Sequence, residues 1–311
     1  MKKVLLFGDP GIDDSLAIIY GLLHPEIEIV GIVTSYGNVT KEQTTHNAVY
    51  LLQLAGRQDI PVISGANAPF LDAFITYYPE IHGPEGLGPV QPPESVKNIP
   101  IHDFSLIPSI VKKHMGELII VDIGRSTFLA IAFNLWKEVM KSVKEVYIMS
   151  GVFLQPRNVT PLAEANAYGD PVSTQFVINH SEKLTMIPLN VTNSAILLPN
   201  EVDYIVAHTN NPYKSLIRPI YQYYYSAYKK LNPSIKGAPI HDLVAVSAVV
   251  NPEYFKYIYR VVEVDIRSIR GRTNADFRPG AKETGVRLGM KLNEKAFIKD
   301  FIDIMVGRGT N

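Results

Sequence analysis

Residues 4–15 read VLLFGDPGIDDS, in which a short apolar run leads into three aspartates and then into a segment with helical spacing. A short apolar run is typical of a buried strand, and the periodicity that follows it is typical of a helix packed on a sheet. The same alternation returns twice, at residues 27–34 then 41–55 and at 118–121 then 127–134. It predicts βαβ units around a mostly parallel sheet.

The remaining apolar runs predict an open α/β sheet with helices on both faces. Residues 145–149 and 184–187 extend the sheet, whereas 257–266 and 286–292 are expected to add edge strands. Because no linker, repeat or break in composition interrupts the chain, residues 1–311 are expected to form a single domain. Two segments are expected to be mobile, a Pro- and Gly-rich loop at 64–100 and an aromatic helix and loop at 221–240.

Composition narrows the class of ligand. The 311 residues include 30 basic and 30 acidic side chains, which gives no global electrostatic attraction to nucleic acid or to an anionic membrane. The absence of cysteine excludes disulfides and thiolate metal sites, and it favours a cytoplasmic protein. The apolar run at residues 4–7 is too short for a signal peptide, and the sequence has no run of ~18 apolar residues that could span a membrane. A small neutral ligand fits this composition best.

Asp9, Asp13 and Asp14 follow the first predicted strand directly. In open α/β sheets ligands bind at the carboxyl ends of the strands, so these carboxylates are expected to face the binding crevice. Clustered carboxylates repel one another unless a cation holds them, and oxygen ligands favour Ca²⁺ or Mg²⁺. The alternative is helix capping, which contributes ~0.3–1 kcal/mol. Capping explains one or two of the three aspartates but leaves the third without a purpose.

Two more polar segments are candidates for the same site. His241 and Asp242 begin another apolar helical segment; Asp242 is either an N-cap or a fourth carboxylate ligand, and His241 is either structural or a proton donor with a pKa near neutrality. Residues 157–166 read RNVTPLAEAN. This segment is either a polar turn or a set of donors and acceptors suited to a polyhydroxylated sugar.

Taken together and in this order, these motifs resemble those of the inosine-uridine preferring nucleoside hydrolases. The hallmark of that family, Asp-x-Asp-Pro-Gly-x-Asp-Asp, is matched from Asp9 to Asp14, and its later Asn-Val-Thr-Pro-x-Ala-Glu-x-Asn segment is matched by residues 158–166. The family's His-Asp pair is matched at 241–242. The resemblance implies a Rossmann-like α/β domain that hydrolyses the N-glycosidic bond of ribonucleosides to free base and ribose.

The resemblance also implies residue roles. Asp9 is expected to be the general base and His241 the acid that assists the leaving base. Metal ligands for Ca²⁺ are expected to be Asp9, Asp14, Asp242 and the backbone carbonyl of Thr127. The residues expected to bind the nucleoside are Asp13, Asn38 and Asn166 at the 2′ and 3′ hydroxyls, Met149, Asn158 and Glu164 around the 5′ end, and His82 near the base. Members of the family are commonly homodimers or homotetramers.

Three departures from the family pattern leave alternatives open. Phe7 stands where the family usually has an aspartate, Gly8 where threonine is common, and Phe128 where asparagine is usual. They motivate a second hypothesis, a nucleoside- or ribose-binding protein with impaired catalysis. A Mg²⁺-dependent phosphohydrolase is less favoured because the first loop has no Lys or Arg to contact a phosphate. The sole tryptophan, Trp136, is expected in the core, which favours the nonspecific or pyrimidine-leaning branches of the family over the purine-specific branch.

Overall fold

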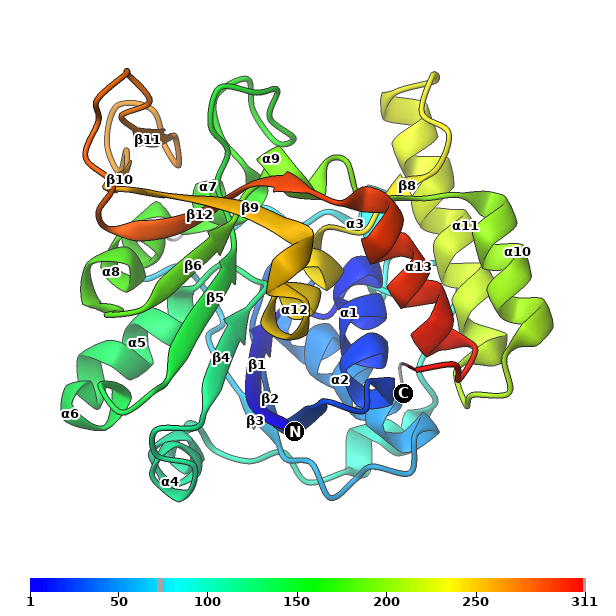
Figure 1. Ribbon diagram of the computed structural model, residues 1–311. Helices are drawn as coiled ribbons and strands as arrows, with labels where there is room; N and C mark the ends of the chain where they lie inside the picture. The colour runs from blue at the N-terminus through cyan, green and yellow to red at the C-terminus, as the bar shows by residue number, and fades with distance from the viewer. Residues whose placement is uncertain (72–74, 310–311) are drawn as a thin grey trace.

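The computed structural model describes residues 1–71 and 75–309 and has a large, mostly parallel sheet at its centre (Figure 1). Within the described residues, eight strands form this sheet. Their order is β3 (Val62–Ser64), β2 (Ile27–Thr34), β1 (Lys2–Gly8), β4 (Ile119–Asp122), β5 (Glu145–Met149), β6 (Leu184–Ile187), β12 (Val286–Leu292) and β9 (Phe255–Arg260). Neighbouring strands are parallel except β12 and β9, which are antiparallel. The predicted α/β fold is therefore confirmed.

Helices cover both faces of the sheet, as expected. Alternate residues of β1 enter different cores, Val4 and Leu6 on one face and Leu5 and Phe7 on the other. The first core includes side chains of α1 (Ile12–Leu23), α2 (Lys41–Leu54), α12 (His241–Val250) and α13 (Glu294–Met305). The second includes side chains of α4 (Ile107–Lys113), α5 (Thr127–Leu135), α6 (Lys137–Met140) and α8 (Pro171–His180). Both faces being buried explains why the central strands are continuous apolar runs.

The other elements lie around this frame. Helices α10 and α11 pack on each other, and two small antiparallel pairs join β7 to β8 and β10 to β11. The bounds are α3 (Pro79–His82), α7 (Ala165–Gly169), α9 (Leu189–Thr192), α10 (Pro199–His208), α11 (Lys214–Leu231), β7 (Ile196–Leu197), β8 (Ala238–Pro239), β10 (Val262–Val264) and β11 (Thr273–Ala275), with 3₁₀ helices at η1 (Glu94–Asn98), η2 (Phe104–Leu106) and η3 (Pro252–Tyr254).

The sheet reverses its winding between β1 and β4. From β1 the chain moves outward to β2 and β3, and it then returns to the other side of β1 as β4 and continues to β5 and β6. At such a point the loops after neighbouring strands diverge, which opens a crevice at their carboxyl ends. The loops that follow Gly8 and Asp122 therefore border the natural binding site of this fold.

Two expectations about the sheet are corrected. The stretch 257–266 is not one edge strand, because exposed Val261 separates β9 from β10, and β10 pairs with β11 outside the main sheet. Strand β12 is not at an edge, since it lies between β6 and β9. The segment 64–100 contains the last residue of β3, then α3 and η1, and the segment 221–240 comprises the second half of α11 and β8.

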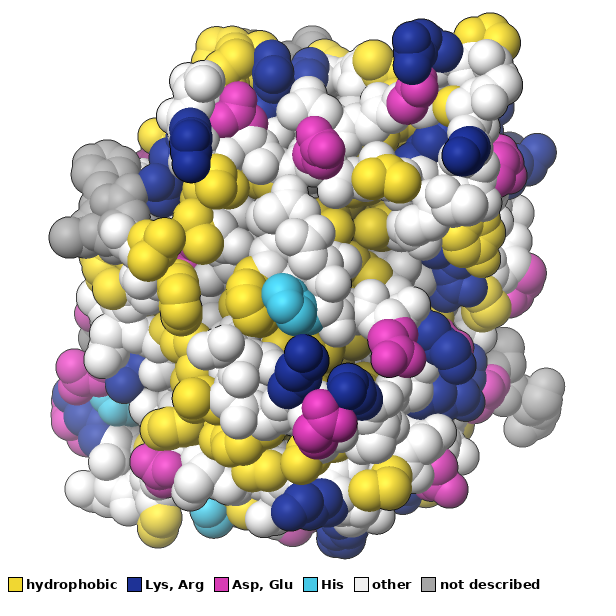
Figure 2. All heavy atoms as spheres, turned by 90° about the vertical axis from the view of Figure 1, so that its left-hand side faces the viewer, with side chains coloured by type: hydrophobic (Ala, Val, Ile, Leu, Met, Phe, Trp, Pro, Cys, Tyr) yellow, Lys and Arg dark blue, Asp and Glu magenta, His cyan; other side chains and the backbone are white. Residues whose placement is uncertain are grey.

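The surface carries charges of both signs. On the face at the left of Figure 1, which includes α6, α8 and β10, Lys and Arg side chains alternate with Asp and Glu and with apolar side chains (Figure 2). This mixture agrees with the formal net charge of zero. Among the described residues, the helices are all too short or too polar to cross a membrane.

Candidate active site

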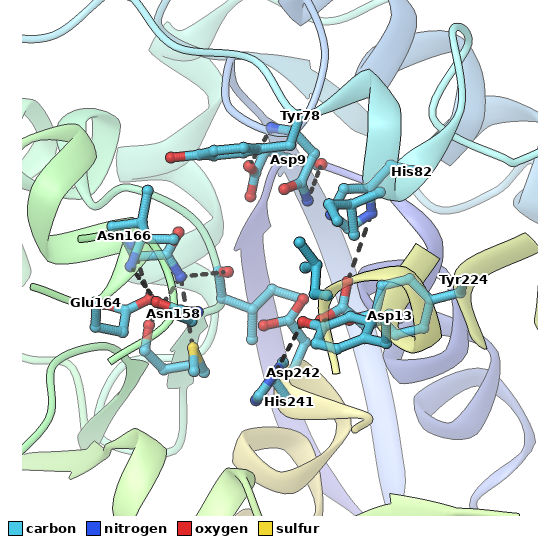
Figure 3. A pocket seen from close by; sticks show the side chains of 18 residues that line it. Asp9, Asp13, Tyr78, His82, Asn158, Glu164, Asn166, Tyr224, His241 and Asp242 are labelled. Carbon is cyan, nitrogen blue, oxygen red and sulfur yellow. Dashed lines mark hydrogen bonds and ion pairs between the residues drawn. The ribbon is translucent and has the colours of Figure 1, made fainter. Parts of the chain in front are cut away.

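One cavity at the carboxyl ends of β1, β4 and β5 brings together almost all of the predicted site residues (Figure 3). Those that line it are Asp9, Asp13, Asn38, His82, Met149, Asn158, Glu164, Asn166, His241 and Asp242. Asp14 has a carboxylate oxygen within 4.8 Å of oxygens of Asp13 and Asp242, and Thr127 lines a small neighbouring cavity with Phe7 and Asp122. Segments separated by more than 200 residues in sequence thus meet in the crevice that the strand order creates.

Asp9 is held in the tightest part of the site. One residue beyond β1, its carboxylate accepts a hydrogen bond from the backbone N–H of Asn38 at 2.7 Å. A Cβ atom on Gly37 would lie only 1.7 Å from Asp9 Oδ2, so only glycine fits beside this carboxylate. Burial raises the pKa of Asp9 to about 7, whereas the positive charge of Arg125 and the hydrogen bond from Asn38 oppose the rise.

Asp14 ties the first loop together. One carboxylate oxygen accepts the backbone N–H of Asp9 at 3.2 Å, and the other accepts the N–H of Gly11 at 3.1 Å and the side-chain amide of Asn38 at 2.8 Å. Capping therefore accounts for part of the role of Asp14, because Gly11 is the N-cap of α1. It does not account for Asp9 or Asp13.

Three buried carboxylates are close enough to hold one metal ion. Asp13, Asp14 and Asp242 each offer an oxygen, and these atoms lie within 4.8 Å of one another. Burial raises the pKa of Asp13 to about 6, and burial together with the neighbouring aspartates raises the pKa of Asp14 and of Asp242 well above the usual range. Among the described residues, Asp13 Oδ1 has no hydrogen-bond partner. An oxygen-only cluster with an unsatisfied buried atom suits a hard divalent cation.

This trio overlaps with the expected ligand set but differs from it. Asp13 was expected to bind the sugar, and Asp9 is outside the trio although its charge raises the pKa of Asp242. Asp242 is not the N-cap of α12, because that position is occupied by Ile240. The hydroxyl of Thr127, the first residue of α5, donates to Asp170 at 2.8 Å and lies 3.0 Å from the hydroxyl of Tyr36. The expected role of Thr127 as a metal ligand would fall to its backbone carbonyl, because its hydroxyl is engaged with Asp170 and Tyr36.

His241 lies at the other side of the cavity, at the first position of α12. Its Nε2 is 3.1 Å from the hydroxyl of Tyr228, and its Nδ1 is 2.8 Å from the hydroxyl of Thr192. Burial lowers the pKa of His241 to about 4, so the near-neutral value expected from the sequence is wrong. The imidazole is neutral at physiological pH and exchanges hydrogen bonds with two hydroxyl groups.

His82 links the long loop to the first helix. The last residue of α3, it is buried, and its Nδ1 accepts the backbone N–H of Ile12 at 3.1 Å. Because Nδ1 is an acceptor, the ring proton resides on Nε2. Burial and the neighbouring His241 lower the pKa of His82 to about 3, which keeps this ring neutral. Its ring centroid lies 5.6 Å from that of Tyr224.

The polar segment after β5 forms the opposite end of the cavity. Glu164 caps α7 by accepting backbone N–H groups of Asn166 and Ala167 at 2.8 and 3.0 Å, and it also accepts the N–H of Gly151 at 2.8 Å. The amide nitrogen of Asn166 donates to the carbonyls of Ile123 and Met149 at 3.1 and 3.0 Å. These bonds connect the loops after β4 and β5. They use the amide nitrogen of the Asn166 side chain, so its amide oxygen Oδ1 can accept a hydrogen bond from a ligand.

The sequence motifs did not reveal several residues of the site. Tyr78, Tyr224 and Tyr228 line the cavity. Arg125 is buried near Asp9, and Asp122 is buried at the end of β4. A usable signal existed for Asp122, because it follows a predicted strand as directly as Asp9 does. Burial raises the pKa of Asp122 to about 7.

The departures from the motif lie beneath the cavity rather than in it. Phe7 and Phe128 both belong to the core on the α5 side of the sheet. In the register of β1 and β4, Phe7 is paired with Asp122. A carboxylate is therefore present one strand away from the position where Phe7 replaces the usual aspartate. At Gly8, a Cβ would lie 3.0 Å from Ile123 Cγ1 and 3.1 Å from Asp14 Oδ1, which leaves little room for a larger residue.

Comparisons with known proteins agree with this geometry. Residues 4–299 match the family described as inosine-uridine preferring nucleoside hydrolase. Uridine nucleosidase 1 of Arabidopsis thaliana is 33% identical over 269 residues, which cover 86% of this chain and 80% of that protein. The inosine-uridine preferring nucleoside hydrolase of Crithidia fasciculata is 32% identical over 302 residues, 95% of each chain. A solved structure of a purine-preferring ribonucleoside hydrolase from Gardnerella vaginalis has a TM-score of 0.90 at 28% identity and 99% coverage of both chains.

Proposed function

Because the chain belongs to the inosine-uridine preferring nucleoside hydrolase family and is a ribonucleoside hydrolase, we propose that it cleaves the N-glycosidic bond with a calcium-bound water and with Asp9 as general base. The observation that carries this proposal is the group of buried carboxylates at the carboxyl ends of β1 and β4. Burying several like charges is costly unless a cation compensates them. A hydrolytic metal site supplies that compensation.

The residues fit a hard divalent cation. Asp14 and Asp242 belong to the buried trio of carboxylates, and Asp9 and the carbonyl of Thr127 complete the proposed ligand set. When bound, Ca²⁺ supplies positive charge that keeps the carboxylates ionised together and lowers the pKa of a coordinated water. Asp13, the third member of the trio, faces the same space and is proposed to hold the ribose hydroxyls beside the metal.

Asp9 is suited to accept the proton of the attacking water. Its carboxylate accepts the N–H of Asn38, and it lies so close to Gly37 and Gly124 that a Cβ atom at either position would clash with its oxygens. A general base works best when its pKa lies near the working pH, and burial brings the pKa of Asp9 to about 7. Cleavage builds positive charge on the ribose ring, and nearby carboxylates stabilise that charge more than they stabilise the neutral substrate.

The leaving base would meet the aromatic side of the cavity. His241 is proposed to assist its departure, with His82 as a second neutral imidazole beside it. With the Thr192 hydroxyl donating to Nδ1, the neutral ring carries its proton on Nε2 and donates it in a hydrogen bond to the Tyr228 oxygen, which leaves the Tyr228 O–H free to donate a hydrogen bond to the departing base. The ribose would extend toward Asn158, Glu164 and Asn166 at the opposite end.

The test is release of free ribose from uridine, inosine, cytidine and adenosine, measured at neutral pH with added Ca²⁺ and after chelation. Release that is lost on chelation and restored by Ca²⁺ is expected. Relatives of this chain are named for uridine, for inosine and uridine, and for purine nucleosides, so the ranking of the four substrates identifies the preferred base. Calcium-dependent binding of nucleosides without release would instead indicate that Phe7 and Phe128 accompany a loss of catalysis.

A further inference from the structure

The hydroxyl group of Tyr78 is an unused hydrogen-bond donor at the wall of the cavity. Tyr78 immediately precedes α3, and its side chain lines the cavity. The hydroxyl oxygen is buried and has no hydrogen-bond partner within residues 1–71 and 75–309. Burial raises the pKa of Tyr78 to about 12, so the hydroxyl keeps its proton. A buried hydroxyl without a partner is costly, and a ligand that accepts its proton would remove that cost.

The Tyr78 hydroxyl faces the sugar end of the cavity. In Figure 3 the ring extends toward the side where Asn158, Glu164 and Asn166 lie, away from His82 and His241. Asn158 and Glu164 line the same end. A ligand in the cavity would therefore meet this hydroxyl with its sugar and not with its base.

Arg125 fixes the Tyr78 ring in this position. Its buried guanidinium donates to the carbonyls of Gly37, at 2.8 Å, and of Thr76. The guanidinium carbon lies 5.0 Å from the ring centroid of Tyr36 and 5.8 Å from that of Tyr78, distances typical of cation–π contacts. Within the described chain, Arg125 has no carboxylate at ion-pair distance. The partners of its guanidinium are therefore backbone carbonyls and aromatic rings in the walls of the site.

The backbone of Tyr78 is held as well. Its N–H donates to the carbonyl of Asn38 at 2.8 Å, and the N–H of the same Asn38 binds Asp9. The Arg125 bond to Thr76 anchors the same loop two residues earlier. A planar guanidinium can bind both carbonyls and stack on both rings at once, which a lysine ammonium cannot do. The loop residue Tyr78 is thereby connected to the fixed ends of β2 and β4.

We propose that Tyr78 is a substrate-binding residue whose hydroxyl donates a hydrogen bond to the 5′-hydroxyl of the ribonucleoside, and that Arg125 is the residue that positions it. The identity of the ligand as a ribonucleoside rests on the function proposed above. The choice of the 5′-hydroxyl rests on the roles expected for Asn158 and Glu164, which line the end of the cavity that the Tyr78 ring faces.

The first experiment compares uridine with 5′-deoxyuridine as substrates of the calcium-supplied wild-type enzyme and of Tyr78→Phe. Phenylalanine keeps the ring on Arg125 and removes only the hydroxyl. The value of kcat/KM for uridine is expected to fall roughly tenfold, the loss of one hydrogen bond, whereas the value for 5′-deoxyuridine stays unchanged. Exposed Tyr77, the adjacent residue, supplies the matched control Tyr77→Phe, which is expected to leave both values unchanged. Equal losses on both substrates, or no loss on uridine, would overturn the assignment.

A binding measurement separates this proposal from the proposed function. If the wild-type protein releases no ribose from any nucleoside, hydrolysis is refuted, and the affinities for methyl β-D-ribofuranoside and its 5-deoxy analogue still test Tyr78 by calorimetry. A weaker affinity of Tyr78→Phe for the first sugar only supports the proposal. Unchanged affinities for both sugars reject it.

The role of Arg125 is tested by a double-mutant cycle with Arg125→Met. In that background, adding Tyr78→Phe is expected to cause little further loss on uridine, because the hydroxyl is already misplaced. The single variant Arg125→Met is expected to raise KM more than it lowers kcat. Arg125→Lys, which keeps the charge, serves if Arg125→Met does not fold, and it is expected to show the same non-additivity in part. Fully additive losses would show that Arg125 does not position Tyr78.

Discussion

Asp9 shows how closely a single residue can be constrained by its neighbours. The carboxylate lies against Gly37 on one side and Gly124 on the other, where Cβ atoms would come within 1.7 and 2.8 Å of its oxygens. Glycine at both positions leaves room for the carboxylate, and the N–H of Asn38 holds it in this orientation by a hydrogen bond. A carboxylate oriented before the substrate arrives favours proton transfer.

Replacing this carboxylate tests its assignment as the base. Asp9→Ala is expected to abolish hydrolysis, by at least ~100-fold in kcat, while the protein stays folded. Initial rates of ribose release report on the first effect, and circular dichroism reports on the second. Asp9→Asn, which keeps the size of the side chain and its bond from Asn38, is expected to be as inactive. Near-normal turnover of either variant would contradict the assignment.

A second residue-level prediction concerns the leaving base. His241→Ala removes the neutral ring that binds the Tyr228 and Thr192 hydroxyls. Turnover of natural nucleosides, whose bases need a proton or a hydrogen bond to depart, is expected to fall ~100-fold or more. An aryl riboside with an activated leaving group needs no proton and is expected to be far less affected. Parallel losses on the two substrates would assign His241 a structural role.

For single residues, the sequence predicted which side chains belong to the site better than it predicted their surroundings in the folded protein. Aspartates and amides after strands were recognisable because the carboxyl ends of parallel strands meet in one crevice. The pKa of His241 could not be predicted, because it depends on the burial of the ring in the folded protein and not on Asp242, its neighbour in sequence. Tyr78 and Arg125 were missed because their roles arise from contacts between loops that are far apart in the chain.

Among the elements, α2 connects the two loops that surround the site. Asn47, a buried residue in the middle of this helix, donates through its amide to the carbonyls of Pro10 and Glu85, both at 2.8 Å. The first carbonyl belongs to the aspartate loop and the second to the loop that follows α3. One helix therefore holds the metal-binding and base-facing loops at a fixed separation.

Asn47→Ala is expected to lower the free energy of unfolding by about 1–3 kcal/mol, because two buried carbonyls lose their donor. It is also expected to raise KM, since both loops contact the ligand. The control on the same helix is Thr40→Ala, which removes an exposed N-cap and is expected to cost about 1 kcal/mol without changing KM. Denaturant unfolding and steady-state kinetics on the two variants measure both effects. If both variants changed KM equally, the cause would be the lower stability of the helix and not the loss of the bonds to the two loops.

The elements themselves were largely predictable, and the exceptions share a cause. The central strands and the helices after them were identified from apolar runs because both faces of each strand are buried. Strand β3 has only three residues and lies beside a loop, so its sequence gave little periodicity. The position of β12 depends on its pairing with β6 and β9. Pairing between distant segments leaves no local pattern.

For the whole molecule, the reversal of winding between β1 and β4 concentrates negative charge at one place. Asp9, Asp13 and Asp14 follow β1, Asp122 ends β4, and Asp242 arrives with α12. All five are buried. Without a cation, the folded protein accommodates them most easily in protonated form, and burial accordingly raises their pKa values. The stability of the entire fold is thereby coupled to pH and to metal.

The sign of this coupling follows from the pKa values. The pKa is about 7 for Asp9 and Asp122 and about 6 for Asp13 in the folded protein, against about 4 for an exposed aspartate. The folded state thus binds protons more tightly than the unfolded state. The associated stabilisation is complete below about pH 4 and is lost as the pH rises through 6 to 7. In chelator, the melting temperature is expected to be higher at pH 5 than at pH 8.

Calcium is expected to stabilise the protein more at pH 8 than at pH 5, because its carboxylate ligands must be deprotonated to bind it. The increase in melting temperature on adding Ca²⁺ should therefore be small at pH 5 and large at pH 8, measured by thermal unfolding in matched buffers.

Asp122→Asn provides the control, because it removes one buried titrating carboxyl outside the proposed ligand set. The pH dependence of the melting temperature in chelator should weaken in this variant, while the response to Ca²⁺ persists. A calcium response independent of pH would show that the buried aspartates do not bind the ion, and an unchanged pH dependence in Asp122→Asn would show that Asp122 does not titrate in this range.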